Sequence, residues 1–207
     1  MNPKRINKKY NNLATSYSGC TLETGVDEAG RGALAGPVVA AAVILSSNFS
    51  CPKIQDSKLL KPEERLEARE YILQNAIGWG LGISSVSTID AINILNATIC
   101  AMNEALMALP ILPEFILVDG NRFQTHLSIP YRCIVGGDKK YLCIAAASIL
   151  AKTYRDEIME HLAKLHPLYA WESNKGYPTP KHREAIAKYG LTPWHRRTFM
   201  QLKDQEA

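Results

Sequence analysis

Apolar residues gather into short runs that alternate with segments of helical periodicity, the pattern of an α/β protein. Residues 38–45 are almost all apolar and rich in Val, as in a strand covered on both faces. A shorter run over residues 22–26 precedes it, and the short connection between the two predicts an antiparallel hairpin. Further strands are predicted over residues 78–86, 115–118 and 133–135.

Longer segments carry the three- and four-residue spacing of helices. Pro62 favours a helix start, because proline suits the first helical turn. Thr88 is the predicted cap of a second helix. Apolar residues then recur along that helix at Ile92, Leu95, Ile99, Met102, Leu106 and Leu109. Two more helices are predicted over residues 142–165 and 180–189.

The segment 142–165 is the most informative. Its first half is apolar on every side, which indicates a buried helix. However, Ser148, Lys152 and Asp156 are spaced by four residues and share one face. A polar stripe on a buried helix requires partners, because an unpaired buried charge is costly. The whole pattern predicts a mixed α/β sheet with helices packed on it and a small helical appendage.

Composition narrows the class of protein only slightly. Hydrophobic residues make up 46% of the 207-residue chain, and the net charge of +4 is compatible with a nucleic-acid partner without requiring one. Five scattered cysteines without a Cys-x-x-Cys pair argue against disulfides or zinc and favour the reducing cytoplasm. No apolar run is long enough to cross a bilayer. We expect a monomer.

The sequence divides into two unequal parts. Residues 1–20 are basic and lack a following apolar stretch, so they are interpreted as a flexible arm and not as a secretory signal. Residues 21–207 form the expected catalytic domain, with a C-terminal helical segment from about residue 166.

Four acidic residues stand out because they lie at the ends of apolar strands or on the polar face of a buried helix. Asp27 and Glu28 stand where a strand gives way to glycines, Asp119 follows the strand 115–118, and Asp156 lies on the polar stripe. If the two strands are neighbours, these carboxylates converge at one sheet edge, where α/β proteins bind ligands. Clustered carboxylates suit Mg²⁺ or Mn²⁺. Two such ions roughly 4 Å apart can drive phosphodiester hydrolysis.

Other interpretations of these acids stay open from spacing alone. An aspartate at a strand end is also typical of a turn, as in Asp119-Gly120. Asp156 and Glu157 are also compatible with a solvated helix surface with Arg155 as partner. Asp27 and Glu28 are adjacent in a strand, so they point to opposite faces unless the strand distorts near Gly30 or each contacts a different ion.

Longer motifs point to one family. The string from Gly25 to Gly32 (GVDEAGRG), followed by LAGPVVAAAV, closely resembles the opening signature of ribonuclease HII, the type 2 ribonucleases H. The resemblance continues in family order to about Phe199 through Asp56-Ser57-Lys58, Val118-Asp119-Gly120-Asn121, the segment from Ile144 to Lys152, Arg155-Asp156, Asn174-Lys175-Gly176-Tyr177 and His195-Arg196-Arg197.

This resemblance implies a ribonuclease H-like fold, with a mixed five-stranded sheet, flanking helices and a C-terminal helical segment. It implies hydrolysis of the RNA strand of RNA/DNA hybrids and incision of duplex DNA on the 5′ side of single embedded ribonucleotides. It assigns the metal ligands and catalytic residues to Asp27, Glu28, Asp119 and Asp156, with Mg²⁺ or Mn²⁺ as cofactor.

The resemblance also assigns substrate contacts. The backbone of Gly30-Arg31-Gly32 would read the 2′-hydroxyl, the group that distinguishes RNA from DNA, and Tyr177 would pack on the sugar of the following deoxynucleotide. Packing alone is the other interpretation of Tyr177. Further contacts are expected from Lys58, Asn121, Ser148, Lys152, Lys175 and Arg196. The alternative function is a non-catalytic duplex-binding module, which would gain nothing from four acids beside phosphates.

Overall fold

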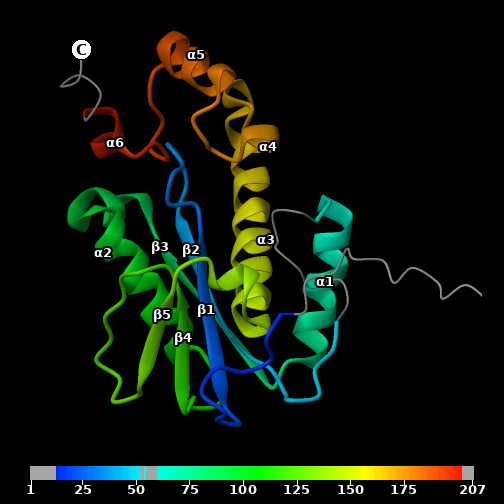
Figure 1. Cartoon of the computed structure of the whole chain (residues 1–207). Coiled ribbons are helices and arrows are strands. Elements are labelled where there is room, and N and C mark those ends of the chain that lie inside the picture. The colour runs from blue at the N-terminus through cyan, green and yellow to red at the C-terminus, as the bar shows by residue number, and fades with distance from the viewer. Residues whose placement is uncertain (1–12, 52–53, 55–59, 202–207) are drawn as a thin grey trace, which may run out of the picture.

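A five-stranded mixed sheet forms the centre of the molecule in this computed structural model, which describes residues 13–51, 54 and 60–201. The strand order is β3-β2-β1-β4-β5 (Figure 1). The strands are β1 (Glu23–Ala29), β2 (Val38–Ile44), β3 (Gly78–Ser84), β4 (Phe115–Asp119) and β5 (Tyr131–Ile134). The predicted sheet is confirmed, and β1 and β2 form the expected antiparallel hairpin.

Alternate residues of β1 and β2 face different helices. Val26 and Ala40 belong to the core cluster on the side of α2 (Val86–Met107). Ala41 belongs to the cluster beneath α1 (Pro62–Asn75) and α3 (Leu142–Leu165). The two central strands are therefore covered on both faces, which explains why β2 is apolar throughout. Figure 1 shows α2 on one side of the sheet and α3 with α1 on the other.

The helix boundaries agree closely with the sequence pattern except at one cap. The predicted extents of the helix from Leu142 and of α5 (Pro180–Tyr189) are confirmed. Thr88 is not the cap of α2, as the sequence suggested; the cap is Ser85, whose hydroxyl accepts a hydrogen bond from the Thr88 amide. Thr88 thus lies inside the helix, at the amide that the cap satisfies.

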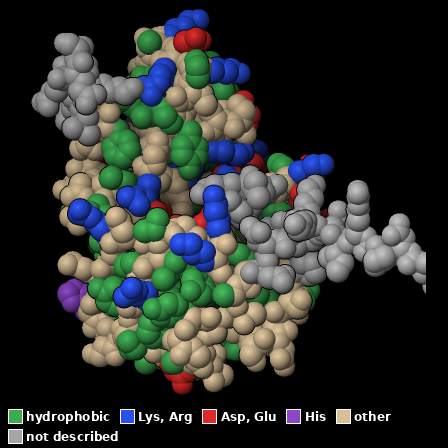
Figure 2. All heavy atoms as spheres, viewed as in Figure 1, with side chains coloured by type: hydrophobic (Ala, Val, Ile, Leu, Met, Phe, Trp, Pro, Cys, Tyr) green, Lys and Arg blue, Asp and Glu red, His purple; other side chains and the backbone are tan. Residues whose placement is uncertain are grey.

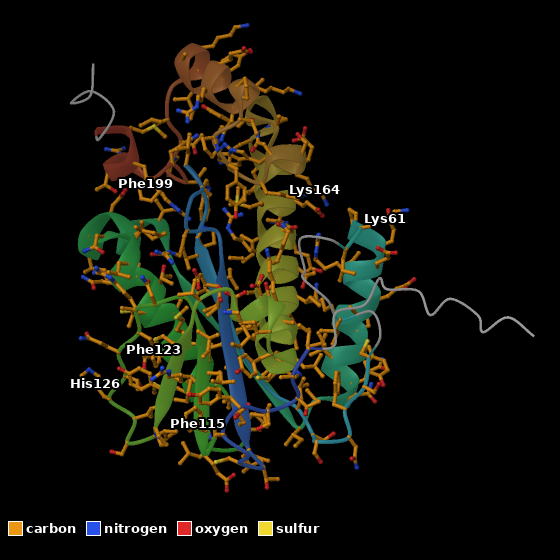
Figure 3. The ribbon with its side chains drawn as sticks, in the orientation of Figure 1. Lys61, Phe115, Phe123, His126, Lys164 and Phe199 are labelled. Atoms are coloured by element: carbon orange, nitrogen blue, oxygen red, sulfur yellow. The ribbon has the colours of Figure 1, made fainter. Side chains whose placement is uncertain are left out.

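The C-terminal segment folds against the far end of α3 and the β1–β2 hairpin (Figure 1). It comprises η2 (Pro167–Tyr169), α4 (Trp171–Asn174), α5 and α6 (Arg197–Gln201). Its own small core includes Met159, Tyr169 and Trp171. Phe199 of α6 packs against the α2 side of the main core, above α2 in Figure 3.

Part of the expected N-terminal arm is bound to the domain. Ala14 pairs with Tyr141 through two backbone hydrogen bonds, from the Ala14 amide to the Lys140 carbonyl and from the Leu142 amide to the Ala14 carbonyl. The buried Glu23 carboxylate accepts hydrogen bonds from the backbone of Tyr17 and Ser18. Ala14, Ser16, Tyr17 and Ser18 therefore have fixed partners on the domain, while the boundary at residue 20 stays a prediction.

No helix within the described ranges combines the length and apolar character needed to cross a membrane.

Candidate active site

The register of β1 and β4 brings two of the four acids together. These strands are parallel neighbours, and Val26 pairs with Val118. The next residues along the two strands are Asp27 and Asp119, so the two aspartates lie side by side at the same end of the sheet. The expectation that the two acidic strands are neighbours is confirmed.

Asp27 is a buried carboxylate in an unfavourable electrostatic environment. Its side chain is 5% exposed and lies on the face of the sheet that α3 covers, where Ser148 of α3 is a hydrogen-bond partner. Burial raises the pKa of Asp27 well above its ordinary value, and the charges of Glu28 and Asp119 raise it further. The bonds from Ser148 and from the Glu28 amide lower the pKa only in part.

Glu28 points to the opposite face of the same strand. Since β1 is regular through Ala29, the strand does not distort before Gly30, and adjacent residues alternate in direction. The Glu28 carboxylate forms an ion pair of 3.2 Å with Arg31. Burial raises the pKa of Glu28, the Arg31 cation lowers it, and Asp119 raises it.

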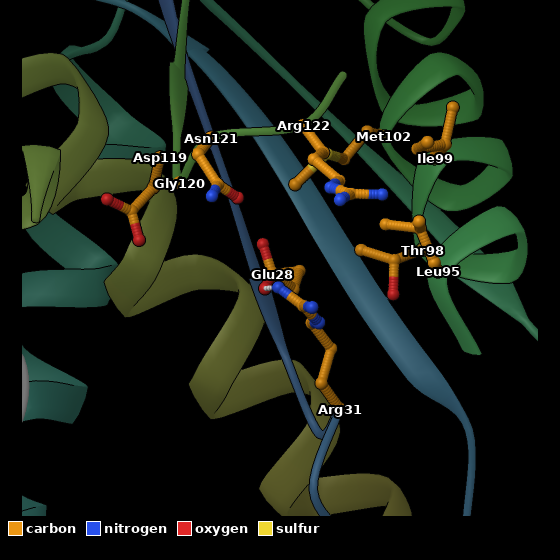
Figure 4. Close-up of a pocket in the computed structure, with 10 residues that line it drawn as sticks. All are labelled: Glu28, Arg31, Leu95, Thr98, Ile99, Met102, Asp119, Gly120, Asn121 and Arg122. Atoms are coloured by element: carbon orange, nitrogen blue, oxygen red, sulfur yellow. Dashed lines mark hydrogen bonds and ion pairs between the residues drawn. The ribbon is translucent and has the colours of Figure 1, made fainter. Parts of the chain in front are cut away.

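Glu28, Arg31 and Asp119 line a cavity of about 270 Å³ between the sheet edge and α2. Figure 4 shows the paired Glu28 and Arg31 on one side and Asp119 with Asn121 on another. The α2 wall is formed by Leu95, Thr98, Ile99 and Met102. Asn121 and Arg122 are exposed at its rim, so this cavity joins an acidic edge to an apolar wall.

Asp119 also has a role in the local loop structure. One of its carboxylate oxygens accepts a 2.7 Å hydrogen bond from the Gly137 amide, and Gly120 has a φ of 96° in the turn that follows. Asp119-Gly120 therefore does form a turn, as one interpretation of the sequence predicted. It does not compete with a ligand role, because a carboxylate offers several acceptor positions.

Asp156 lies two helical turns beyond Ser148 on the polar face of α3. Its carboxylate accepts hydrogen bonds of 2.9 and 3.1 Å from the Lys152 ammonium. The alternative that Arg155 is its surface partner is wrong, because Arg155 is 1% exposed and donates to backbone carbonyls. The preceding residue, Arg155, occupies the space beside Gly30 of the glycine turn.

The carboxylates do not form a closed metal cage. Within the described ranges, no group of three or more His, Cys, Asp or Glu side chains is arranged as a site that could hold a metal ion. The donor chemistry nevertheless fits Mg²⁺ or Mn²⁺, because such ions are commonly held by one or two carboxylates together with waters and substrate phosphate. A cation here would also relieve the repulsion between Asp27 and its acidic neighbours.

The glycine turn contains two glycines with different environments. Gly30 has a φ of 98°, and a Cβ atom there would lie 2.0 Å from the Arg155 Nε atom, so the fold itself requires glycine. Gly32 is exposed, and a Cβ atom there would meet no protein atom within 4 Å. The open space at Gly32 lets a ligand approach the backbone closely.

Tyr177 lies beside this turn. The Gly176 carbonyl accepts hydrogen bonds from the Leu34 and Ala35 amides, which ties the Tyr177 segment to the end of the turn. The Tyr177 ring lies 5.2 Å from the Arg155 guanidinium carbon and is 37% exposed. Tyr177 is thus packed on one face and accessible on another, which leaves room for the contact expected from the sequence.

The structure places the remaining residues that were expected to contact substrate in different environments. The Lys175 ammonium donates to the Glu160 carboxylate at 2.7 Å and to the Glu172 carbonyl. Arg196 was expected to contact phosphate, which is wrong: its side chain is completely buried. Its guanidinium instead donates to the carbonyls of Gly36, Arg31 and Pro37. Lys58 lies outside the described residues.

A buried arginine cluster lies behind the turn, and the sequence pattern did not predict it. Arg155 and Arg196 stand together there, and burial, followed by the charge of Arg155, lowers the pKa of Arg196 to about 9. Nothing in the local spacing distinguishes these arginines from surface cations. One signal was present in the sequence. Arg155 follows the apolar first half of α3, which is buried on every side, and this indicates that the arginine is also buried.

The comparison with known proteins decides the family. A family model described as ribonuclease HII matches residues 24–202. The chain belongs to the ribonuclease HII family. A ribonuclease HII from Porphyromonas gingivalis strain W83 is 55% identical over 184 residues, 89% of this chain and 92% of that protein. One from Bacteroides fragilis strain YCH46 is 54% identical over 183 residues, covering 88% and 91%.

Solved structures of ribonuclease H2 and ribonuclease HII share the fold. The ribonuclease H2 of Pyrococcus horikoshii OT3 has a TM-score of 0.71 at 27% identity, covering 85% of this chain and 92% of that one. A chain in the PCNA:RNase HII complex from Archaeoglobus fulgidus has a TM-score of 0.65 at 25% identity, covering 85% and 94%. The fold is therefore ribonuclease H-like, and the chain is an endoribonuclease of the type 2 ribonuclease H class. Enzymes of the ribonuclease HII family depend on a divalent metal ion.

Proposed function

We propose that this enzyme hydrolyses the RNA strand of RNA/DNA hybrids and incises duplex DNA on the 5′ side of a single embedded ribonucleotide, acting in ribonucleotide and primer removal. The observation that carries the proposal is the β1–β4 register, which sets Asp27 beside Asp119 at the sheet edge that also bears the exposed glycine turn. A phosphodiester at this edge lies within reach of both the acids and a ribose-reading backbone.

Asp27, Glu28, Asp119 and Asp156 are the residues that would hold the metal. Asp27 and Glu28 leave β1 on opposite faces, so the arrangement favours contacts to different ions over two ligands to one. When bound, Mg²⁺ or Mn²⁺ supplies activation of the attacking water and stabilisation of the leaving oxygen in phosphodiester hydrolysis. The products are a 3′-hydroxyl on the upstream nucleotide and a 5′-phosphate on the ribonucleotide.

The chain's own residues orient the substrate. The backbone of Gly30, Arg31 and Gly32 contacts the ribose 2′-hydroxyl and the adjoining phosphates, where the missing side chain at Gly32 permits close approach. The Tyr177 ring packs on the sugar of the following deoxynucleotide, a contact that favours a residue without the 2′-hydroxyl. Together these contacts select a junction between ribose and deoxyribose.

Polar and basic side chains around the acids contact the backbone of the duplex. Asn121 lines the cavity beside Asp119, and the Lys152 ammonium stands on the α3 face that carries Ser148. Figure 2 shows Lys and Arg side chains gathered across the middle of one face of the molecule. Phosphate contacts of this kind make binding dependent on salt. Lys175 can join them only by leaving Glu160.

The proposal includes the setting of the enzyme. Residues 21–207 act as one catalytic domain, the working form is a monomer, and the compartment is the cytoplasm. The free thiols of Cys20, Cys51, Cys100, Cys133 and Cys143 support a reducing environment.

The decisive experiment uses three end-labelled substrates of one sequence: duplex DNA with a single ribonucleotide, an RNA/DNA hybrid and all-DNA duplex. Each is incubated with Mg²⁺, Mn²⁺ or EDTA. We expect metal-dependent cutting directly 5′ of the ribonucleotide, cutting along the hybrid, and an intact DNA duplex. Folded protein that leaves both ribose-containing substrates intact with either ion would overturn the proposal.

Variants separate catalysis from mere binding. Asp27→Asn should retain binding to the ribonucleotide duplex and lose cutting. Glu184→Gln is the matched control, because Glu184 is an exposed acid on α5, away from the sheet edge. Binding without cutting by the wild-type protein is the result that the non-catalytic alternative requires, and the family comparison gives that alternative no support.

A further inference from the structure

Arg155 is a buried cation in contact with the substrate-reading segments. It lies on α3 next to Asp156 and is 1% exposed. Its Nε atom donates to the Pro37 carbonyl at 3.0 Å, one terminal nitrogen donates to Ala35 at 3.1 Å, and the other donates to Lys175 at 2.9 Å. One side chain therefore joins α3, the end of the glycine turn and the segment that carries Tyr177.

The chemistry of the guanidinium makes this junction rigid. A buried charge is tolerated only where fixed dipoles replace water, and here backbone carbonyls from two segments supply them. The guanidinium is a planar fork, so three carbonyls bonded to it acquire a set spacing and direction. A lysine ammonium in the same place would be a point charge on a flexible stem and would not impose that geometry.

Two further contacts connect Arg155 to the parts that read the substrate. The guanidinium lies 5.2 Å from the Tyr177 ring, so that side chain covers it. The Arg155 stem also occupies the place of a Cβ atom at Gly30. The turn and Tyr177 thus both contact one side chain. Any movement of Arg155 displaces both.

We propose that Arg155 is a positioning residue that fixes the spacing between the glycine turn and Tyr177, so that the ribose contact and the deoxyribose contact act as a single junction reader. This inference rests on the proposed function. It explains why a charged side chain occupies a core position beside Asp156. Arg196, which donates to the Arg31 and Gly36 carbonyls, holds the same turn from the other side.

Arg155→Lys tests the proposal, because it keeps the charge and removes the fork. We expect kcat/KM to fall by about tenfold or more on duplex DNA with one ribonucleotide, and clearly less on a long hybrid. Adding Tyr177→Ala should then cost much less than it costs in the wild type, since both changes remove the same contact. A merely structural role would lower kcat/KM equally on both substrates. It would also leave the loss caused by Tyr177→Ala the same in the variant as in the wild type.

Arg69→Lys is the matched control. Arg69 is also a largely buried arginine that covers a tyrosine ring, Tyr154, at 4.0 Å, and it is paired with Glu157. Its contacts are with residues of α3 that touch neither the turn nor Tyr177. We expect this variant to keep the wild-type ratio of activities on the two substrates. An altered ratio in Arg69→Lys equal to that in Arg155→Lys would overturn the specific role of Arg155.

A second measurement does not depend on the folding of an Arg155 variant. In metal-free Tyr177→Ala, Arg155 loses its cover, so the amides of Leu34 and Ala35 should exchange hydrogen faster by about tenfold. Tyr189→Ala, which uncovers Lys188 instead, should leave these amides unchanged. Unchanged exchange at Leu34 and Ala35 in Tyr177→Ala would refute the coupling.

The two measurements separate failure of this inference from failure of the proposed function. Wild-type protein that cannot cut either ribose-containing substrate contradicts the function. Active wild-type protein with an unchanged substrate ratio in Arg155→Lys contradicts only the inference. Hydrogen exchange needs neither metal nor substrate, so it reports on Arg155 in both cases.

Discussion

At the scale of single residues, the proposed catalytic role of Asp27 and the stability of the fold make opposite demands. The side chain is buried beside two other acids, and its pKa is raised first by burial and then by Glu28 and Asp119. An uncharged side chain at this position would cost less free energy to bury. The proposed metal ligation therefore explains this carboxylate, whereas its contribution to the fold does not.

We predict that Asp27→Asn abolishes cutting and does not destabilise the metal-free protein. Loss of a metal ligand removes several kcal/mol of transition-state stabilisation, a rate loss on the order of a thousandfold. The midpoint of thermal unfolding in EDTA at pH 8 should stay the same or rise, because a buried charge is removed. Single-turnover cleavage and calorimetry measure the two effects. Wild-type cleavage would remove Asp27 from the mechanism.

The two glycines of the turn should respond differently to alanine. Gly32→Ala meets open space, so the free energy of unfolding should change by less than about 0.5 kcal/mol, while kcat/KM on a single ribonucleotide falls by about tenfold or more. Gly30→Ala meets Arg155 at a φ of 98° and should lower stability by about 1–2 kcal/mol from backbone strain alone. Denaturant titration and cleavage assays separate the two effects, and equal stability losses would contradict this assignment.

The residues that sequence reasoning found differ from those it missed for a physical reason. Asp27 and Asp119 could be found because acids at the ends of apolar strands are out of place in a core. The apolar helix half before Arg155 indicates that this arginine is buried, but its role could not be predicted. That role depends on carbonyls from residues 35, 37 and 175, which come together only in the folded chain. Arg196 was mistaken for a phosphate contact for the same reason.

At the scale of elements, the C-terminal segment is held by a chain of neutral side chains. The Trp171 indole donates to Nε2 of His182 at 2.9 Å, and the Thr192 amide donates to Nδ1 of His195 at 2.9 Å. Since those atoms accept, His182 donates through Nδ1 to the Tyr177 carbonyl and His195 donates through Nε2 to His182. Both rings must be neutral for this network to exist.

We predict that acid weakens this network. Burial, and after it the neighbouring His182 ring, lower the pKa of His195 to about 4, against an ordinary value of 6.5. A lowered histidine pKa gives stability that is fully present above pH 6.5 and is lost as the pH falls towards 4. His195→Asn should therefore lose less stability than the wild type between pH 6.5 and 4 in thermal unfolding.

The control for that prediction is His161→Asn, because His161 is exposed on α3. It should follow the wild-type dependence on pH. Parallel curves for His195→Asn and the wild type would show that the network does not resist protonation.

Elements with strong periodicity could be predicted well, whereas short elements could not. The helix Leu142–Leu165 follows from its own apolar pattern, and its ends agree with the structure. The helix Arg197–Gln201 was missed because five residues carry too little periodicity. Its start depends on Asp90, whose carboxylate accepts from the Arg197 and Thr198 amides across more than 100 residues of chain.

At the scale of the whole molecule, the acids on one sheet edge make folding and metal binding interdependent. A raised carboxylate pKa means that the stability of the metal-free protein is fully present below the ordinary pKa, 3.8 for Asp27, and is lost as the pH rises through the raised value. Glu28 acts in the same direction, since its pKa is also raised. A divalent cation bound only by the folded state offsets this loss.

We therefore predict that Mg²⁺ or Mn²⁺ raises the midpoint of thermal unfolding, and does so more at pH 8 than at pH 5, where protons compete for Asp27. A gain of 1 kcal/mol corresponds to about 3 °C for a chain of this size. NaCl at equal ionic strength is the control for screening, and the combined Asp27→Asn and Asp119→Asn variant should lose the response. Equal responses in that variant and the wild type would place the ion elsewhere, because the repulsion it relieves would no longer be that between Asp27 and Asp119.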